Sequence, residues 1–282
     1  MKIGGGVQKR VYRFVVLCLA FLASVNVAIA ENLVIPGSGS PEYVLDQLAK
    51  AFNAKQAQHR VVVPPSSGTA GALRDVGEGL STLGRVGRPL KEEERAQGFV
   101  YLPLGRDPVV VVGGAGVTVR AISWTQLVEV FAGNVTNWQE LGGSSAPVRV
   151  VGREQSDTSR QALMAVIKAF REVSYGSRLK MVHLDPQLIE LIDRYPTSLS
   201  YINRSNLPLF KTRVVPLALE GVEPTPENVE KGKYPVWIEF GLIYKESQGM
   251  SAAAKAFVEF VRSPEGVRML RTHGILPSAS VR

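Results

Sequence analysis

The chain has 282 residues, a formal net charge of +8 and hydrophobic residues at 45% of its positions. Its lysines and arginines are scattered, with no basic helix face and no interleaved aromatic side chains, and this argues against nucleic-acid binding. A modest positive field suits a small anionic ligand, and excess Lys and Arg equally serve solubility.

Residues 1–30 have the pattern of a secretory signal peptide. Four basic residues precede an apolar run at 14–23, and Ala28-Ile29-Ala30 provides a small-x-small cleavage site. A permanent membrane anchor is the weaker alternative, because the apolar run is short for a span of about 20 residues. The only cysteine, Cys18, lies inside this segment, so the mature chain is predicted to have no disulfide and no thiol chemistry.

Beyond residue 31, short apolar stretches alternate with segments of helical spacing. In chain order we expect a strand at 33–36, a helix at 41–54, a strand at 60–63 and a helix at 69–80. A break at 104–108 leads into four consecutive valines, which suit a buried strand. After it we expect a helix at 124–131, a strand at 148–151, a helix opened by Ser156, strands at 199–202, 214–219 and 237–244, and helices at 252–261 and from Pro264.

This alternation predicts an α/β fold whose sheet is made of largely parallel strands with right-handed crossovers. The chain leaves its first α/β lobe near residue 108 and returns near residue 240. We therefore expect one lobe from 31–107 with 241–282, a second from 108–240, and a hinge between them. Ligands of open α/β sheets bind at the carboxyl ends of strands, which places the expected site in the cleft between the lobes.

Three short turns rich in Gly, Ser and Thr each precede a run with helical apolar spacing, at 37–41, 66–69 and 156–159. The first turn of a helix carries unpaired N–H groups and the positive end of the helix dipole. Three such helix starts facing one point would hold phosphate, sulfate or carboxylate. Ser, Thr and Asp are also ordinary N-caps, and for any single turn capping is the favoured interpretation. The binding hypothesis rests on the set of three.

Residues 130–143 read VFAGNVTNWQELGG and closely resemble the F-x-G-x-I-T-N-W-x-x-hydrophobic-G-G signature of the phosphate-binding periplasmic receptors of ABC transporters. Segments 84–90, 150–158 and 265–277 resemble further motifs of that family, in the same order, and the resemblance covers nearly all of residues 31–278. It implies a two-lobed, type II periplasmic-binding-protein-like fold that closes on a tetrahedral oxyanion.

Carried over residue by residue, the resemblance implies ligand contacts from four segments. These are Ser38, Gly39 and Ser40; Ser67, Gly68 and Thr69; Gly87 and Arg88; and Arg153, Ser156, Asp157 and Thr158. Arg153 matches the anion-pairing arginine of the family, whose planar guanidinium pairs two oxyanion oxygens. The alternative for Arg153 is a surface arginine paired with Glu154 or Asp157.

Three positions depart from the family pattern. Gly87 stands where receptors of high selectivity carry a polar or acidic side chain, and Asp157 replaces the glycine of an S-G-T motif. An ionised Asp157 would repel a dianion unless it accepts a hydrogen bond from a protonated oxygen, so capping of the following helix is its favoured role. Arg85, where the family is usually apolar or small, either adds charge to the cleft or faces solvent.

The expected protein is thus a secreted, periplasmic and monomeric solute-binding protein that captures inorganic phosphate and delivers it to an ABC permease, without catalysis, cofactor or metal. No acid–base pair is recognisable, which disfavours an enzyme on this scaffold. The second alternative is a sensor or surface interaction protein that has lost high-affinity phosphate binding, which the departures at Gly87 and Asp157 would explain.

Overall fold

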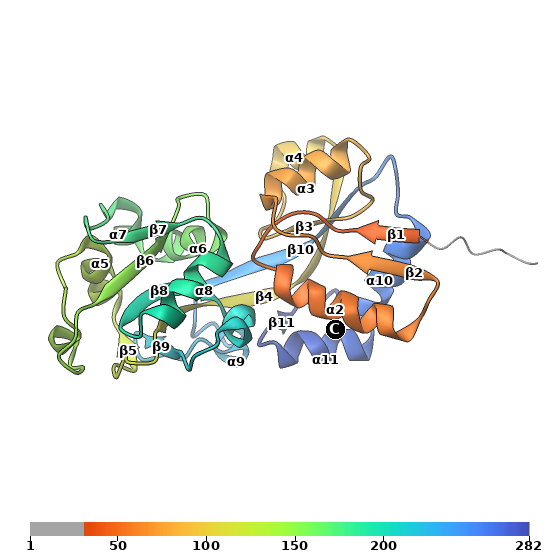
Figure 1. Cartoon of the computed structure of the whole chain (residues 1–282). Coiled ribbons are helices and arrows are strands. Elements are labelled where there is room, and N and C mark those ends of the chain that lie inside the picture. Colours follow the sequence, from red (N-terminus) through yellow and green to blue (C-terminus); the bar gives the residue numbers. More distant parts are fainter. Residues whose placement is uncertain (1–30, 282) are drawn as a thin grey trace, which may run out of the picture.

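The computed structural model describes residues 31–281, so the predicted signal peptide lies outside the described residues. Figure 1 shows two groups of helices and strands joined by the long strands β4 (Phe99–Gly113) and β10 (Trp237–Lys245). Both ends of the described chain belong to the same group. The predicted lobe limits at 107/108 and 240/241 fall inside these two continuous strands.

The first group contains the N-terminal elements and the last two helices. Its elements are β1 (Glu31–Val34), α2 (Glu42–Lys55), β2 (His59–Val62), α3 (Gly68–Gly77), β3 (Gly84–Val86), α4 (Glu92–Ala96), α10 (Ala252–Arg262), α11 (Pro264–Thr272) and β11 (Leu276–Pro277). Strands β1 and β2 pair in parallel as a separate small sheet. Strand β10 lies between β3 and β4 and is antiparallel to both. The carboxyl ends of β1, β2 and β3 lead into loops that face the second group.

The second group contains the middle of the chain. Its elements are β5 (Ala121–Ile122), α5 (Trp124–Ala132), η1 (Trp138–Leu141), β6 (Arg149–Arg153), α6 (Thr158–Val166), α7 (Lys168–Glu172), β7 (Lys180–Val182), α8 (Asp185–Arg194), β8 (Ser198–Asn203), η2 (Arg204–Leu209), β9 (Val215–Leu219) and α9 (Pro226–Glu230). Strand β6 is parallel to both β7 and β8, and β5 is parallel to β9. Helices α6 and α8 follow β6 and β7, so both begin at the edge that faces the first group (Figure 1).

Strand β4 is shared by the two groups. Its first part pairs with β10 and its last part with β8 and β9. The four valines at 109–112 are fully buried, as predicted. The predicted break at 104–108 is wrong, because the strand continues through it. A register shift opposite Phe240 and Gly241 absorbs the irregularity as a bulge.

The α/β class is confirmed, but the expectation of largely parallel strands is wrong for the centre of the nine-stranded sheet. Strands β3, β4, β8, β9, β10 and β11 are joined there by antiparallel pairing. The reason is topological: a chain that leaves one group along β4 and returns along β10 must run in opposite directions in those two strands.

Every predicted helix and strand is present, and the predicted ends differ by at most three residues, except that the valine strand begins earlier, at Phe99. Trp138 is 1% exposed and donates a hydrogen bond from Nε1 to the carbonyl of Thr197 at 2.9 Å, so this signature residue packs in the core. Helix α8 was not predicted, although Pro186 in its first turn and the buried Leu188, Ile189 and Ile192 are a helix signature. Helix α8 is important because its first residues lie at the cavity between the two groups.

Candidate functional site

A cavity of about 1260 Å³ lies between the two groups. Eleven of the twelve residues predicted to contact ligand line it; the exception is Ser67. They come from four segments that are remote in sequence. The fold therefore brings together residues that separate sequence motifs had indicated. That these residues contact a ligand remains a prediction.

The first loop, residues 37–40, is fixed by its own backbone. Gly37 has a φ of 138°, and a Cβ there would lie 2.0 Å from the carbonyl oxygen of Arg85, so only glycine fits. The N–H of Ser38 donates to the same carbonyl at 3.0 Å. Ser38 and Ser40 are 4% and 6% exposed, and both line the cavity. The loop therefore presents two buried hydroxyls just before α2.

Arg85 lies beneath this loop, which corrects both sequence-based alternatives for it. Its side chain is fully buried and reaches neither the cavity nor solvent. The guanidinium donates to the carbonyls of Ser38 at 2.8 Å, Pro64 at 2.7 Å and Ile35, and pairs with Glu42 at 3.1 Å. Burial lowers the pKa of Arg85, and burial also raises the pKa of Glu42 against the influence of Arg85. Arg85 thus holds the turns before α2 and α3 together.

The second loop presents Ser66 instead of the predicted Ser67. Ser66 lines the cavity; its Oγ accepts from the N–H of Gly68 and donates to the carbonyl of Gly37, both at 3.3 Å. Ser67 precedes α3, and its Oγ is turned back onto the helix, 2.4 Å from where a Cβ on Gly71 would lie. The sequence contains both serines side by side, and no pattern in it distinguishes them.

The third segment brings Gly87 and Arg88 to the cavity. A Cβ on Gly87 would lie 2.8 Å from Ser38 Oγ and 3.0 Å from Thr158 Cγ2, so a residue from each group closes on this glycine. Arg88 is bound in a bidentate pair to Glu94, at 2.8 and 2.6 Å, and this pairing lowers the pKa of Glu94. The departure at Gly87 is therefore a packing requirement.

In the second group, Asp157 caps α6, which confirms the favoured interpretation. Its Oδ1 accepts from the N–H of Arg160 at 2.9 Å, while Oδ2 lies 2.8 Å from a terminal nitrogen of Arg153. Burial raises the pKa of Asp157, although the charge of Arg153 opposes the rise. The carboxylate is therefore turned toward Arg153 and capped against the helix, with both oxygens engaged.

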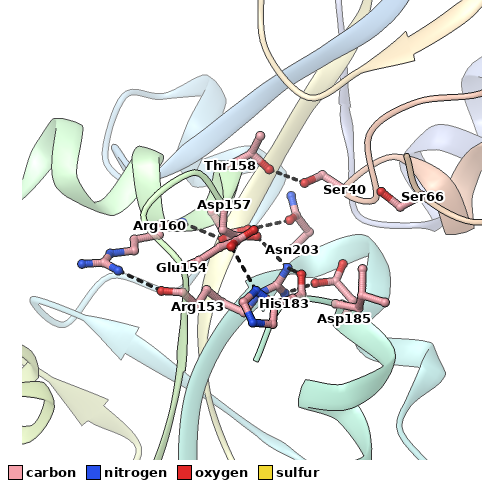
Figure 2. A network of polar contacts seen from close by, with 12 residues as sticks. Ser40, Ser66, Arg153, Glu154, Asp157, Thr158, Arg160, His183, Asp185 and Asn203 are labelled. Atoms are coloured by element: carbon pink, nitrogen blue, oxygen red, sulfur yellow. Dashed lines mark hydrogen bonds and ion pairs between the residues drawn. The ribbon is translucent and has the colours of Figure 1, made fainter. Parts of the chain in front are cut away.

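Arg153 lies between two carboxylates (Figure 2). It pairs with Asp157 and with Asp185, and it also donates to the carbonyl of His183 at 3.1 Å. Burial alone would lower the pKa of Arg153, but the two aspartates outweigh it and raise that pKa. Its Nε is buried and has no hydrogen-bond partner among the described residues. The pairing with Asp157 was the alternative from sequence, but Arg153 is only 6% exposed and is not a surface residue.

Three further residues of the cavity were missed by the sequence analysis. Asp185 opens α8, and its Oδ2 accepts from the amide of Asn206 at 2.9 Å. Glu42 lies in the first turn of α2, opposite Asp185, and the charge of Asp185 contributes to its raised pKa. The acidic residue and proline that begin α8 could have pointed to Asp185; nothing local in the sequence points to Asn206.

The two groups meet at Ser40 and Thr158, whose hydroxyls are hydrogen-bonded to each other across the cavity (Figure 2). Hydroxyls and helix starts from both sides are therefore directed at one region, which is the arrangement needed to surround a small oxyanion with uncharged donors. Among residues 31–281, no three His, Cys, Asp or Glu side chains are grouped so as to hold a metal ion. Over the same residues, no helix combines the length and apolarity needed to cross a membrane.

Comparison with known proteins gives consistent relatives. The chain is 25% identical to the phosphate-binding protein PstS of Bacillus subtilis over 89% of its length and 82% of that protein. It is 21% identical to PstS of Borreliella burgdorferi, over 86% of this chain and 88% of the relative.

Among solved structures, it resembles a phosphate ABC transporter substrate-binding protein from Clostridium perfringens crystallised with bound phosphate. The TM-score is 0.76 at 26% identity, covering 88% of this chain and 99% of the other. These relatives confirm the resemblance seen in the motifs. A family model described as a PBP superfamily domain matches residues 26–265. The chain therefore belongs to the PBP superfamily.

Proposed function

We propose that this protein is a solute-binding protein that captures inorganic phosphate in the cleft between two lobes and hands it to an ABC importer. The observation that carries the proposal is the convergence of four separate loops on one cavity, with hydroxyls at Ser38, Ser40, Ser66 and Thr158. The relatives named as phosphate-binding proteins, and the neighbour with phosphate bound, support the choice of ligand.

The protein works by binding and closure, without catalysis. Strands β4 and β10 connect the groups and serve as the hinge, with the lobes dividing at 107/108 and 240/241. Ser38, Gly39, Ser40, Gly68, Thr69, Gly87, Arg88, Arg153, Ser156, Asp157 and Thr158 form the ligand-facing set, joined by Ser66 in place of Ser67. In this role the protein is exported by residues 1–30, acts in the periplasm as a monomer, and docks on a membrane permease.

The test is calorimetric titration of the ligand-stripped mature protein with phosphate and, separately, with sulfate. We expect saturable binding of phosphate. Thr158→Val removes a hydroxyl that lines the cavity and should weaken binding, because one lost hydrogen bond to a charged ligand costs about 1.5–3 kcal/mol. Thr118→Val is the matched control, since Thr118 is an exposed threonine of the same group outside the cavity.

If the folded, ligand-stripped protein shows no heat of binding with phosphate, the proposal is wrong. A sensor or interaction protein that does not bind phosphate tightly would then be the better account. If Thr158→Val and Thr118→Val lose phosphate affinity equally, the protein would still be a phosphate-binding protein. The cavity would then not be its binding site.

A further inference from the structure

The segment that joins β6 to α6 carries four of the residues predicted to contact phosphate. Arg153 ends β6, Asp157 caps α6, and Thr158 is the first residue of the helix. Ser156, between them, is exposed and lines the cavity. A loop whose donors are already in place binds an anion at a smaller entropic cost than a loop that must first be ordered. The contacts that hold residues 153–158 in place therefore bear on affinity.

Arg160 holds this segment at both ends. Its Nη1 donates to the carbonyl of Arg153 at 2.9 Å, and its backbone N–H donates to the carboxylate of Asp157, also at 2.9 Å. Figure 2 shows the guanidinium reaching the Arg153 carbonyl on the side away from the contact between Ser40 and Thr158. Arg160 does not line the cavity. One residue in the first turn of α6 thus bonds both the last residue of β6 and the cap of the helix.

The aromatic core directs the guanidinium of Arg160. Its Cζ lies 4.4 Å from the ring centroid of Tyr175, a stacking distance for an arginine on an aromatic face. The Tyr175 hydroxyl lies 3.3 Å from that of Tyr201, and the Tyr175 ring lies 5.8 Å from that of Phe131. The Nε of Arg160 is buried and has no hydrogen-bond partner among the described residues. Contact with the ring, together with the bond to the Arg153 carbonyl, therefore sets the direction of the side chain.

On the basis of the proposed function, we propose that Arg160 is a positioning residue for phosphate binding, which holds residues 153–158 from behind the cleft in the conformation that receives the anion. Without its bond to the Arg153 carbonyl, the loop gains conformational freedom that binding must remove again. The affinity for phosphate then falls although no group that faces the anion has been changed.

The charge of Arg160 offers a rival explanation, because a cation behind the loop also attracts an anion. Tyr175 separates the two explanations. Replacing its ring leaves the positive charge of Arg160 in place but removes the surface on which the guanidinium lies. A positioning role predicts a loss of affinity in Tyr175→Leu, and a charge effect predicts none.

The experiment is calorimetric titration of the ligand-stripped mature chain with phosphate. We expect Arg160→Met, which keeps an extended side chain but not its donors, to bind phosphate about tenfold more weakly than the wild type, the order of one lost hydrogen bond. Tyr175→Leu should bind about threefold more weakly, in keeping with one lost cation–π contact.

Each variant has a matched control in the same group. Arg171 donates to the carbonyls of Met164 and Ala165, at the other end of α6 and outside the cavity. The ring of Tyr195 lies 5.0 Å from the guanidinium carbon of Arg149, also outside the cavity. Arg171→Met and Tyr195→Leu should therefore bind phosphate like the wild type.

Amide hydrogen exchange of the phosphate-free protein tests the position of the loop directly. Exchange at residues 154–158 should be faster in Arg160→Met than in the wild type, because local opening exposes these N–H groups more often. Arg171→Met should leave it unchanged. Faster exchange throughout the second group by the same factor would mean general destabilisation and would overturn the proposal.

Arg160→Met with the affinity of the wild type, or with a loss no greater than that of Arg171→Met, would also overturn it. So would unchanged affinity in Tyr175→Leu, or exchange at residues 154–158 that does not differ from the wild type. If Arg160→Met does not fold, the two tyrosine variants still decide between position and charge.

A wild type that binds no phosphate overturns the proposed function and this inference with it. Wild-type phosphate binding together with any of the contrary results in the variants overturns this inference alone.

Discussion

Each side of the cleft is built on a buried arginine, and the two are used differently. Arg85 in the first group is fully buried. It donates hydrogen bonds mainly to backbone carbonyls and pairs with one carboxylate, that of Glu42. Arg153 in the second group is 6% exposed, and its guanidinium pairs mainly with the carboxylates of Asp157 and Asp185. The first arrangement fixes the shape of the loops, and the second sets the charge of the cleft.

The difference shows that an arginine near an anion site cannot be assigned from its position in a motif. Carbonyl partners leave the positive charge of Arg85 in place but bury it beneath the loop, away from the cavity. Carboxylate partners leave Arg153 at the cavity wall but cancel its charge. Burial and partner type decide what each guanidinium does.

The largest expected effect comes from breaking the first arrangement. Arg85→Met removes the donor shared by three carbonyls and leaves Glu42 half-buried without its cation, so we expect a loss of about 3–5 kcal/mol in the free energy of unfolding. Urea unfolding measures it. Arg74→Met is the control, because Arg74 is exposed and pairs with Asp75 alone among residues 31–281, and it should cost less than about 1 kcal/mol. Equal costs in both variants would contradict the structural role of Arg85.

Asp107 is a third buried ionisable residue, and within the described part of the chain it forms no ion pair. Asp107 is 1% exposed on β4, accepts from the N–H of Ser205 at 3.2 Å, and burial raises its pKa to about 7. The folded state therefore keeps a proton that the unfolded chain releases near its ordinary pKa of 3.8. Stability is lost as pH rises between these two values.

Asp107→Asn cannot ionise and should escape that loss. At pH 8 we expect it to be more stable than the wild type by about 2–4 kcal/mol, since each unit of pKa difference corresponds to about 1.4 kcal/mol. At pH 4 the advantage should vanish. Thermal unfolding across this range measures the difference, and a variant that is equally stabilised at both pH values would show that ionisation is not the cause.

The same contrast explains how much of the fold and of the site could be predicted from the sequence. Periodicity located the elements well, because each has a buried face of its own, as in α2 with Val44, Leu45 and Leu48. The motifs located the loops of the site. They could not give the partners of Arg153, because Asp185 and Asn206 are distant in sequence and only the packing of α8 and η2 brings them there. Arg85 was misjudged for the same reason, since its carbonyl partners leave no side-chain pattern.

Gly87 tests whether the two sides must approach one another. Gly87→Val adds a branched side chain where even a Cβ would lie 2.8 Å from Ser38 Oγ and 3.0 Å from Thr158 Cγ2, so it should hold Ser40 and Thr158 apart. We expect phosphate affinity to fall at least tenfold, about 1.4 kcal/mol, as measured by calorimetry. Ala115→Val is the control, because it adds the same two methyl groups at an exposed turn position outside the cavity. Affinity that survives in Gly87→Val would mean that binding does not need this approach.

The smallest expected effect separates the two adjacent serines. Ser66→Ala removes a hydroxyl that lines the cavity and should weaken phosphate binding about fivefold, in keeping with about 1 kcal/mol for one hydrogen bond. Ser67→Ala should leave the affinity unchanged, because Ser67 lies outside the cavity. The reverse pattern in calorimetric titration would restore the residue first indicated by the sequence motif.

The position of β10 in the sheet governs the order in which the molecule can fold. Strand β10 lies between β3 and β4, yet it is made only after the entire second group has been synthesised. Until residues 237–245 arrive, the first group lacks the strand that joins its sheet, and pairing over so long a sequence separation is slow. The N-terminal half therefore remains incomplete during most of synthesis, and its loops at 37–41 and 66–69 reach their final positions only after the C-terminal strand is added.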